Sequence, residues 1–186
     1  IGVGLVGSEM CIRDRDMFES PAKFFEYFLK DEASIRQLID NAGLDNVDAE
    51  GIRAHIEAKR ETVPFTYRIG LSNAAIDIAI HGLETIEEGF DVATLGKEAY
   101  DRIFLGGHRV HATNKGHFWA YGYDGSFYGY RLADVVAADF ATKFFESGQG
   151  LLDPETGFAF RKIMLERGAS EDYADLIAEF LGREFS

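Results

Sequence analysis

Helix-start signals recur along this chain, and each is followed by apolar residues at helical spacing. Ser20 is a candidate N-cap, and Pro21 follows it at the first helical position, where the missing N–H of proline costs nothing. Asp153 and Pro154 repeat the arrangement near the other end of the chain. No pair of alternating segments predicts a β-hairpin, and residues 109–112 are the one candidate strand. The pattern therefore predicts an all-α fold.

Glycines and prolines set the expected bounds of the helices. Gly43, Gly168 and Gly182 are candidate stops, because glycine adopts the left-handed conformation in which many helices end. Pro64 lacks an N–H and is expected to begin a helix rather than to lie inside one. We expect helices over residues 20–42 with a break near 31, from 48, from 64 to about 80, over 91–104, over 126–147, from 153 to 168 and from 170 to 182.

The first residues do not share this pattern. Residues 7–15 have neither helical nor strand periodicity and look like translated adaptor or vector sequence. We therefore expect residues 1–14 to be a non-native leader and residues 15–186 to be the folded part. The single cysteine, Cys11, lies in that leader, so a catalytic thiol is not expected. One cysteine also excludes a disulfide framework and favours a reducing compartment, and we expect the protein to be cytoplasmic.

The charge of the chain excludes several classes of partner. The formal net charge is −13, whereas nucleic acids and anionic membrane surfaces require clustered lysine and arginine. No run of residues approaches the ~20 apolar residues of a membrane span. Because 46% of the residues are hydrophobic, the chain has enough apolar material for its own core. We expect a monomer that binds neither nucleic acid nor membrane.

Residues 106–130 are the segment in which we expect a site. They are rich in glycine and aromatic residues without a clear period, which is typical of a loop, and they hold three of the five histidines. A metal site built from His108, His111 and His117 is one alternative. No carboxylate lies at ligand spacing, so ordinary polar residues are the favoured interpretation of these histidines.

No complete catalytic motif is present in the sequence. H-E-x-x-H, G-x-S-x-G, a phosphate-binding glycine loop and C-x-x-C are all absent from it. Asp77 and His81 are four positions apart in a predicted helix, so their side chains share one face and can form a pair. A structural contact is the favoured interpretation of this pair, and a catalytic dyad is the alternative.

Residues 116–130, G-H-F-W-A-Y-G-Y-D-G-S-F-Y-G-Y, carry a resemblance to a known family. They resemble the signature loop of the thimet oligopeptidase, neurolysin and dipeptidyl carboxypeptidase family of zinc metallopeptidases, in which G-H, G-Y-D-G and Y-Y-G-Y precede a long helix. Residues 15–21 resemble the R-D-F-V-E-x-P-S segment of that family. Three later stretches agree with its C-terminal part: residues 150–157, 167–170 and 180–184. The resemblance covers residues 15–186 and implies the helical C-terminal portion of a thermolysin-like catalytic domain.

The family implies zinc as the cofactor and short peptides as substrates. Zinc is held there by the two histidines of H-E-x-x-H and by a glutamate from a following helix, and the glutamate within the motif acts as general base. Glu19 matches the third of these ligands. The resemblance begins after the place of the H-E-x-x-H helix, so it implies a single metal ligand in this chain and a catalytically incomplete fragment.

The aromatic segment supplies the residues that the resemblance places at the substrate. Two match catalytic positions, His117 and Tyr130. Three match substrate-binding positions, Gly122, Tyr123 and Tyr128. In the family such phenol and imidazole groups donate hydrogen bonds to the scissile carbonyl or to nearby peptide groups. Donors of this kind stabilise the negative oxygen of the tetrahedral intermediate.

The chain departs from the family pattern at two places, and two functions stay open. The stretch from His117 to Tyr123 is one residue longer than usual, and Phe127 stands where the first tyrosine of Y-Y-G-Y is expected. The favoured hypothesis is a C-terminal fragment of a zinc-dependent oligopeptidase that hydrolyses short peptides, with Glu19 near Tyr130 in space. The alternative is a non-catalytic helical module that binds peptides or a partner protein through the aromatic segment.

Overall fold

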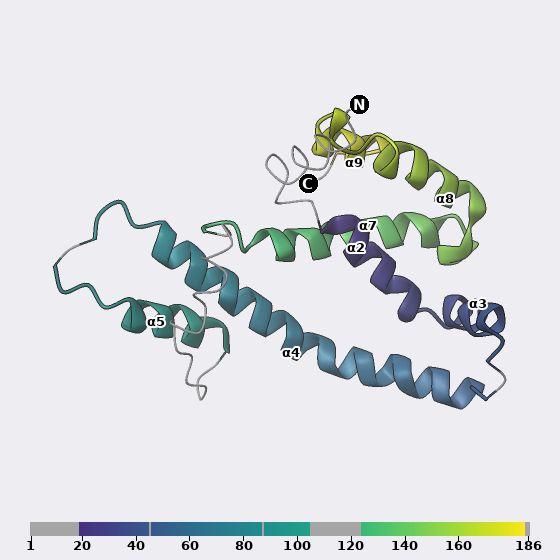
Figure 1. Cartoon of the computed structure of the whole chain (residues 1–186), viewed down its shortest axis with the longest axis horizontal. Coiled ribbons are helices and arrows are strands. Elements are labelled where there is room, and N and C mark those ends of the chain that lie inside the picture. The colour runs from purple at the N-terminus through teal and green to yellow at the C-terminus, as the bar shows by residue number, and fades with distance from the viewer. Residues whose placement is uncertain (1–18, 45, 87, 105–123, 185–186) are drawn as a thin grey trace, which may run out of the picture. The chain divides into compact units, whose positions relative to one another are not determined.

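The computed structural model describes residues 19–44, 46–86, 88–104 and 124–184 (Figure 1). The elements in chain order are α2 (Ser20–Phe25), η1 (Glu26–Leu29), α3 (Glu32–Ala42), α4 (Ala49–His81), α5 (Val92–Phe104), α7 (Gly129–Glu146), η3 (Gly150–Leu152), α8 (Pro154–Phe160), η4 (Arg161–Leu165), η5 (Gly168–Ser170) and α9 (Tyr173–Leu181). No strand occurs in the described ranges, and the predicted all-α class is confirmed. None of the helices in these ranges is long and apolar enough to cross a membrane.

The chain divides into two compact units. The first unit joins residues 1–60 to residues 133–186, and the second unit holds residues 61–132. α4 and α7 each contribute residues to both units, because each helix crosses a boundary between them. Each unit has a buried apolar cluster of its own.

Capping residues begin and end several helices, and Gly43 and Gly182 end theirs where the sequence predicts. Asp31 accepts a hydrogen bond from Ser34 N at the start of α3, and Gly43 ends that helix with a φ of 65°. α9 begins at Tyr173 rather than at residue 170, with Asp172 accepting a hydrogen bond from Ala174 N, and Gly182 ends it with a φ of 75°. These contacts satisfy backbone groups that a helix leaves unpaired at its ends, so short polar residues and glycine fix the bounds.

Pro64 does not begin a helix, and α4 is longer than predicted. The helix runs unbroken from Ala49 to His81 with Pro64 inside it. An interior proline leaves the carbonyl four positions earlier without its usual partner, at a cost of about 3 kcal/mol or more. Arg60 and Pro64 are both exposed, so water can reach that carbonyl and the helix continues. The prediction of separate helices from residues 48 and 64 is therefore wrong.

Three other helix bounds differ from the predicted ones. Glu19 rather than Ser20 is the N-cap of α2, since Ser20 already belongs to the helix. α7 begins at Gly129 rather than at residue 126, because residues 124–128 form turns. The helix predicted over 153–168 ends earlier, in the π-helical turn η4.

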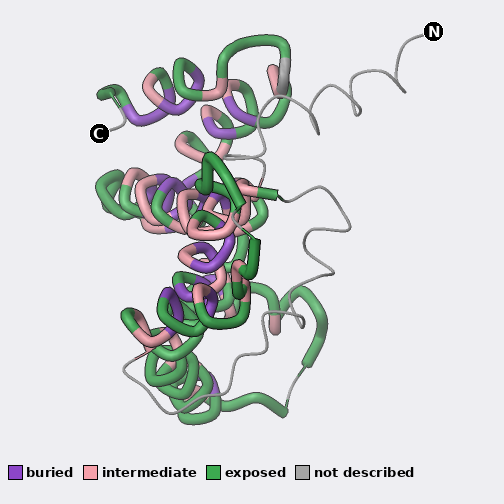
Figure 2. Tube along the Cα trace, turned by 90° about the vertical axis from the view of Figure 1, so that its left-hand side faces the viewer, coloured by how far each residue is buried: buried purple, intermediate pink, exposed green. Residues whose placement is uncertain are grey.

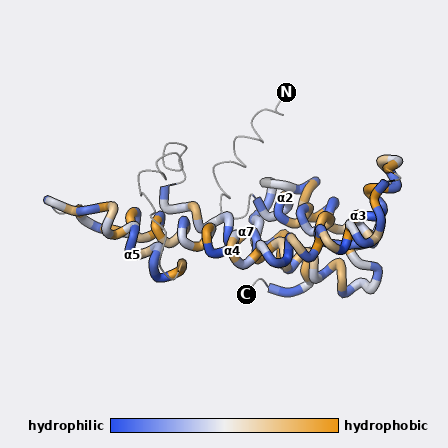
Figure 3. Tube along the Cα trace, turned by 90° about the horizontal axis from the view of Figure 1, so that it is seen from below, coloured by the Kyte–Doolittle hydropathy of each residue, from blue (hydrophilic) through white to orange (hydrophobic). Residues whose placement is uncertain are grey.

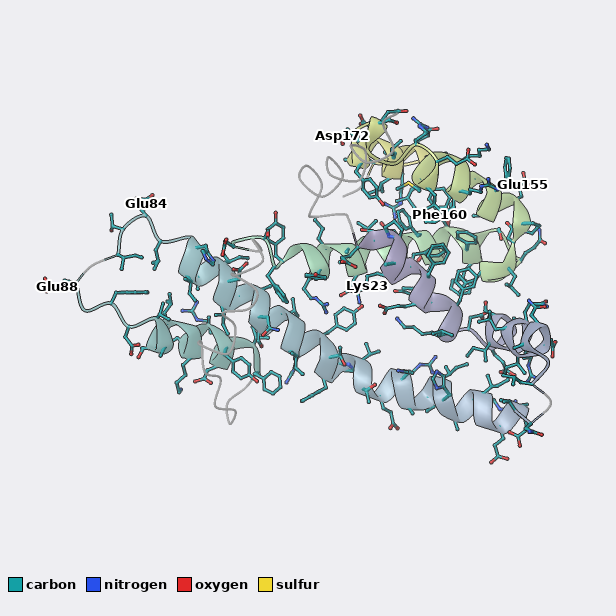
Figure 4. The ribbon with its side chains drawn as sticks, viewed as in Figure 1. Lys23, Glu84, Glu88, Glu155, Phe160 and Asp172 are labelled. Atoms are coloured by element: carbon teal, nitrogen blue, oxygen red, sulfur yellow. The ribbon has the colours of Figure 1, made fainter. Side chains whose placement is uncertain are left out.

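Phenylalanine rings fill the core of the first unit. The ring centroid of Phe24, on α2, lies 5.0 Å from that of Phe144 and 4.8 Å from that of Phe160. Other buried apolar side chains come from α7, η3, η4 and α9: Val136, Ala137, Phe140, Ala141, Leu151, Met164, Leu176, Ile177, Phe180 and Leu181. Buried segments of these helices face one another (Figure 2), and Phe160 points into the cluster of rings (Figure 4). Aromatic pairs at these separations stabilise a core beyond their area burial.

The apolar cluster described in the second unit is smaller and joins α4 to α5. Its buried members are Ile76 on α4 and Ala99 and Tyr100 on α5. The Tyr100 ring stacks on that of Phe104, with 4.8 Å between centroids. Hydrophobic and hydrophilic residues are interspersed along α4 (Figure 3), and most of its buried residues lie in its C-terminal half. This packing fixes the C-terminal half of α4, which carries Asp77.

Candidate functional site

Residues 124–130, here called the tyrosine turn, lead directly into α7. Arg131 N donates a hydrogen bond to the carbonyl of Tyr128 at 2.8 Å, so helical bonding begins within the turn. α7 then continues for 18 residues from Gly129. Tyr128 and Tyr130 therefore lie at the start of a long helix, which restricts their backbone more than a loop would.

Tyr130 packs against the residue at which the chain departs from the family pattern. The centroids of the Phe127 and Tyr130 rings are 5.2 Å apart, and their planes meet at 47°. Tyr128 and Tyr130 are both half-buried. Phe127 keeps the ring of the expected tyrosine and lacks its hydroxyl. It can support Tyr130 by packing, but it cannot donate a hydrogen bond to a substrate.

Asp77 is a buried acid on α4 that contacts the tyrosine turn. Its residue is 4% exposed, and its carboxylate accepts hydrogen bonds from Gly125 N at 3.1 Å and Phe127 N at 2.9 Å. His81 Nδ1 lies 2.8 Å from Asp77 Oδ1, so the predicted contact between these two side chains is confirmed. Sequence reasoning missed the contact with the turn, because 48 and 50 positions separate the partners and no local pattern marks it.

Arg131 provides a second contact between α4 and the start of α7. Its Cζ lies 5.4 Å from the centroid of the Tyr67 ring, which is a cation–π geometry. A Cβ added at Gly70 would lie 2.6 Å from Arg131 Cζ, so the glycine leaves room for the guanidinium. Because α4 has 3.6 residues per turn, Tyr67, Gly70 and Asp77 lie on one face of this helix.

Glu19, the expected metal ligand, is the N-cap residue of α2. Its side chain makes no capping hydrogen bond, and the residue is half-buried. Glu19 belongs to the first unit and Tyr130 to the second. The expectation that the two side chains lie near each other stays a prediction.

Several predicted residues lie outside the described ranges. They are His117, Gly122 and Tyr123, together with His108, His111 and the candidate strand 109–112. Within the ranges that the structure describes, no group of three or more His, Cys, Asp or Glu side chains could hold a metal ion. Catalytic zinc needs about three protein ligands, and the role of Glu19 as one of them stays a prediction.

A pocket of about 410 Å³ in the first unit contains none of the predicted site residues. Its lining residues are Lys143, Ser147, Gln149, Asp153, Glu155, Thr156, Ala159 and Phe180. Thr156 Oγ1 donates a hydrogen bond to Asp153 Oδ2 at 2.6 Å, and this bond holds the pKa of the Asp153 carboxyl below its usual range. Lys143 Nζ donates one to the carbonyl of Leu181 at the end of α9, at 3.4 Å. The polar groups of this pocket thus hold helix ends.

The chain belongs to peptidase family M3. The model of that family matches residues 9–186, a range that includes every described element from α2 to α9 and the tyrosine turn. The resemblance carried by the aromatic segment is thereby confirmed at the level of the family.

The chain is similar over part of its length to curated proteins named oligopeptidase A and saccharolysin. The chain is 44% identical over 68 residues to oligopeptidase A of Escherichia coli (strain K12). The aligned residues cover 37% of the chain and 10% of that relative. It is 40% identical over 70 residues to saccharolysin of Saccharomyces cerevisiae. Here the aligned residues cover 37% of the chain and 9% of that relative. The chain thus spans about a tenth of the length of the curated relatives that it matches.

Proposed function

We propose that the chain is the C-terminal portion of the catalytic domain of a zinc-dependent oligopeptidase, which hydrolyses peptide bonds in short peptides. The match of the M3 family model to residues 9–186 carries the proposal. The name of one similar protein, oligopeptidase A, supports peptides as the substrate class. The sequence lacks H-E-x-x-H, so the chain by itself is catalytically incomplete.

Tyr130 has the central role in this proposal. Its phenol donates a hydrogen bond to the substrate carbonyl oxygen as that oxygen gains negative charge. Its half-buried place at the start of α7 supports this role, because a donor acts best when it is held in position before the reaction. His117 acts beside it as the second catalytic residue.

The remaining predicted residues bind the substrate or the metal. Tyr128, Tyr123 and Gly122 bind the peptide, and the glycine lets the peptide approach the backbone closely. Glu19 is one metal ligand. Since no group of three or more His, Cys, Asp or Glu side chains in the described ranges could hold a metal ion, the proposal assigns no catalytic step at the metal to this chain.

A chimaeric enzyme tests the proposal. Residues 15–186 are joined behind the N-terminal part of a family member that carries H-E-x-x-H. We expect the purified chimaera to cleave a short quenched-fluorescence peptide in the presence of zinc, and we expect the 186-residue chain alone to leave it intact. A chimaera that is folded by circular dichroism and contains zinc, yet cleaves no peptide, would contradict the proposal.

The alternative is a non-catalytic helical module that binds peptides or a partner protein through the aromatic segment. The same chimaera decides between the two functions, because a binding module has no reason to restore hydrolysis.

A further inference from the structure

Asp77 contacts the tyrosine turn through both oxygens of its carboxylate. Oδ1 accepts a hydrogen bond from Gly125 N at 3.1 Å, and Oδ2 accepts one from Phe127 N at 2.9 Å. A buried carboxylate needs such donors because they replace the water that it has lost. We infer that Asp77 is a positioning residue, which fixes the backbone of the tyrosine turn and thereby the positions of Tyr128 and Tyr130.

Both amides donate to Asp77 ahead of the local backbone bonds that the structure describes in the turn. The local bonds begin later, with Gly129 N donating to the carbonyl of Ser126 at 3.1 Å. The amides that precede a helix have no partner inside it, and a negative charge near them is favoured by the helix dipole. Asp77 therefore acts on α7 as a capping residue does, although it comes from another helix. Bonds to a charged acceptor are about twice as strong as bonds between neutral groups.

His81 supports Asp77 from the same helix. Its Nδ1 lies 2.8 Å from Asp77 Oδ1, and its Cβ lies 3.5 Å from the place that a Cβ at Gly125 would take. Gly125 has a φ of 68°, which a residue with a side chain adopts only with strain. His81 Nε2 is 3.8 Å from Asp124 Oδ1, so the imidazole lies between two carboxylates. His81 Nδ1 also lies 3.0 Å from the backbone carbonyl oxygen of Asp77, so the imidazole contacts both the backbone and the carboxylate of Asp77 while both carboxylate oxygens bind the turn.

Arg131 fixes the other end of the turn against the same face of α4. Its guanidinium lies over the Tyr67 ring and beside Gly70. The chain is therefore held before α7, at Gly125 and Phe127, and again in the first turn of α7, at Arg131. Two separated contacts with one rigid helix restrict rotation as well as translation, which a single contact cannot do.

The catalytic meaning of this inference rests on the proposed function. A phenol that donates to a developing oxyanion must be held within about 0.5 Å of its productive place, and that precision comes from residues behind it. Asp77 supplies such support without touching the substrate. The geometric part of the inference can be measured in the chain as it is.

The test compares Asp77→Asn with Glu61→Gln in the 186-residue chain. Both variants replace a carboxylate of α4 by an amide, but Glu61 is exposed and serves as the matched control. Asparagine has one acceptor oxygen, so one of the two backbone amides loses its acceptor. We expect hydrogen exchange at Gly125 or Phe127 to become about tenfold faster or more, the size expected for one bond to a charged group. The Glu61→Gln variant should leave both amides unchanged.

Fluorine NMR of chain labelled with 3-fluorotyrosine reports the tyrosines directly. In Asp77→Asn the resonances of Tyr128 and Tyr130 should shift or broaden, whereas those of Tyr27 and Tyr173 in the first unit should not. Asp77→Glu keeps two acceptor oxygens and should restore slow exchange at least in part. This variant and the exchange rates of the unsubstituted chain keep the test decisive if Asp77→Asn does not fold.

Two results would overturn the inference. One is fast exchange of both turn amides in the unsubstituted chain. The other is an Asp77→Asn spectrum in which the turn amides and the two tyrosines are unchanged. Neither readout depends on hydrolysis, so a failure here is distinct from a failure of the chimaera to cleave peptides.

Discussion

The Phe160 ring is the side chain through which the packing of the first unit is best tested. It is 3% exposed, and its centroid lies 4.8 to 6.3 Å from those of the neighbouring rings of Phe24, Phe25, Phe140, Phe144 and Phe180. Phe160→Ala removes all of these contacts and leaves a cavity between four elements. We expect the free energy of unfolding of the first unit to fall by about 3–5 kcal/mol.

The assay is urea unfolding followed by far-UV circular dichroism. A loss of about 4 kcal/mol lowers the midpoint by about 2 M when the slope is about 2 kcal/mol per molar urea. Phe158→Ala is the matched control, because Phe158 lies on the same helix and is 59% exposed. Its described partner is Lys162, whose Nζ lies 5.6 Å from the ring centroid, a contact that contributes about 0.5–1 kcal/mol at an exposed site.

The comparison of the two alanine variants can refute this argument. Equal midpoint shifts for Phe160→Ala and Phe158→Ala would mean that the ring cluster does not form the core of the unit. Phe160→Leu separates ring contacts from volume, because it keeps most of the apolar bulk. We expect Phe160→Leu to lower the free energy of unfolding by less than Phe160→Ala does. Hydrophobic substitutions that a core tolerates well cost up to about 1.5 kcal/mol.

Three further measurements test the site and the pH response. In the chimaera, Tyr130→Phe should lower kcat about 10²–10³-fold with a smaller effect on KM, since an oxyanion donor acts in the transition state; unchanged steady-state kinetics would remove Tyr130 from the site. Calorimetric titration of the 186-residue chain with zinc should show no tight one-to-one complex, and a tight complex would revive the site at His108, His111 and His117. Thr156→Ala should raise the lowered pKa of Asp153, which an NMR titration measures. Because that pKa is lowered in the folded chain, the ionised carboxylate stabilises the fold at pH values above its usual pKa of 3.8. This stabilisation is lost as the pH falls through the pKa of the folded chain. The Thr156→Ala variant should lose the stabilisation at a higher pH than the unsubstituted chain.

Local signals predicted the helix ends well, for a physical reason. A cap such as Asp153 binds an amide two positions away, and Gly182 ends its helix by its own backbone conformation. Both effects depend on neighbours in the chain, so sequence alone reveals them. The contact between Asp77 and His81 was predictable for the same reason, since residues four apart on a helix are neighbours.

Contacts between distant segments were not predictable in this way. Pro64 is a helix breaker by local rules, but α4 continues past it at a point where Arg60 and Pro64 are exposed. The bonds from Gly125 and Phe127 to Asp77 depend on how α4 meets the turn. No periodicity or motif predicts that contact between α4 and the turn. An aspartate in a helical sequence does not by itself indicate which distant residues it binds.

Among the described residues, the tyrosine turn lies in the unit with the smaller buried apolar cluster. The first unit gathers many buried rings, whereas the cluster described in the second unit consists of Ile76, Ala99 and Tyr100 with partly buried neighbours. The tyrosine turn is held instead by directional contacts, from Asp77 and Arg131. Directional bonds fix orientation closely, which a hydrogen-bond donor in a catalytic site requires.

This division has a consequence for substitutions. A buried polar contact fails as a whole, because the loss of one partner leaves the other buried without its bond. An apolar core loses stability in proportion to the volume removed and often keeps its arrangement. Hydrogen exchange measured across the whole chain should therefore respond in the second unit to Asp77→Asn and in the first unit to Phe160→Ala. Loss of protection in both units with either variant would show instead that the two units unfold as one.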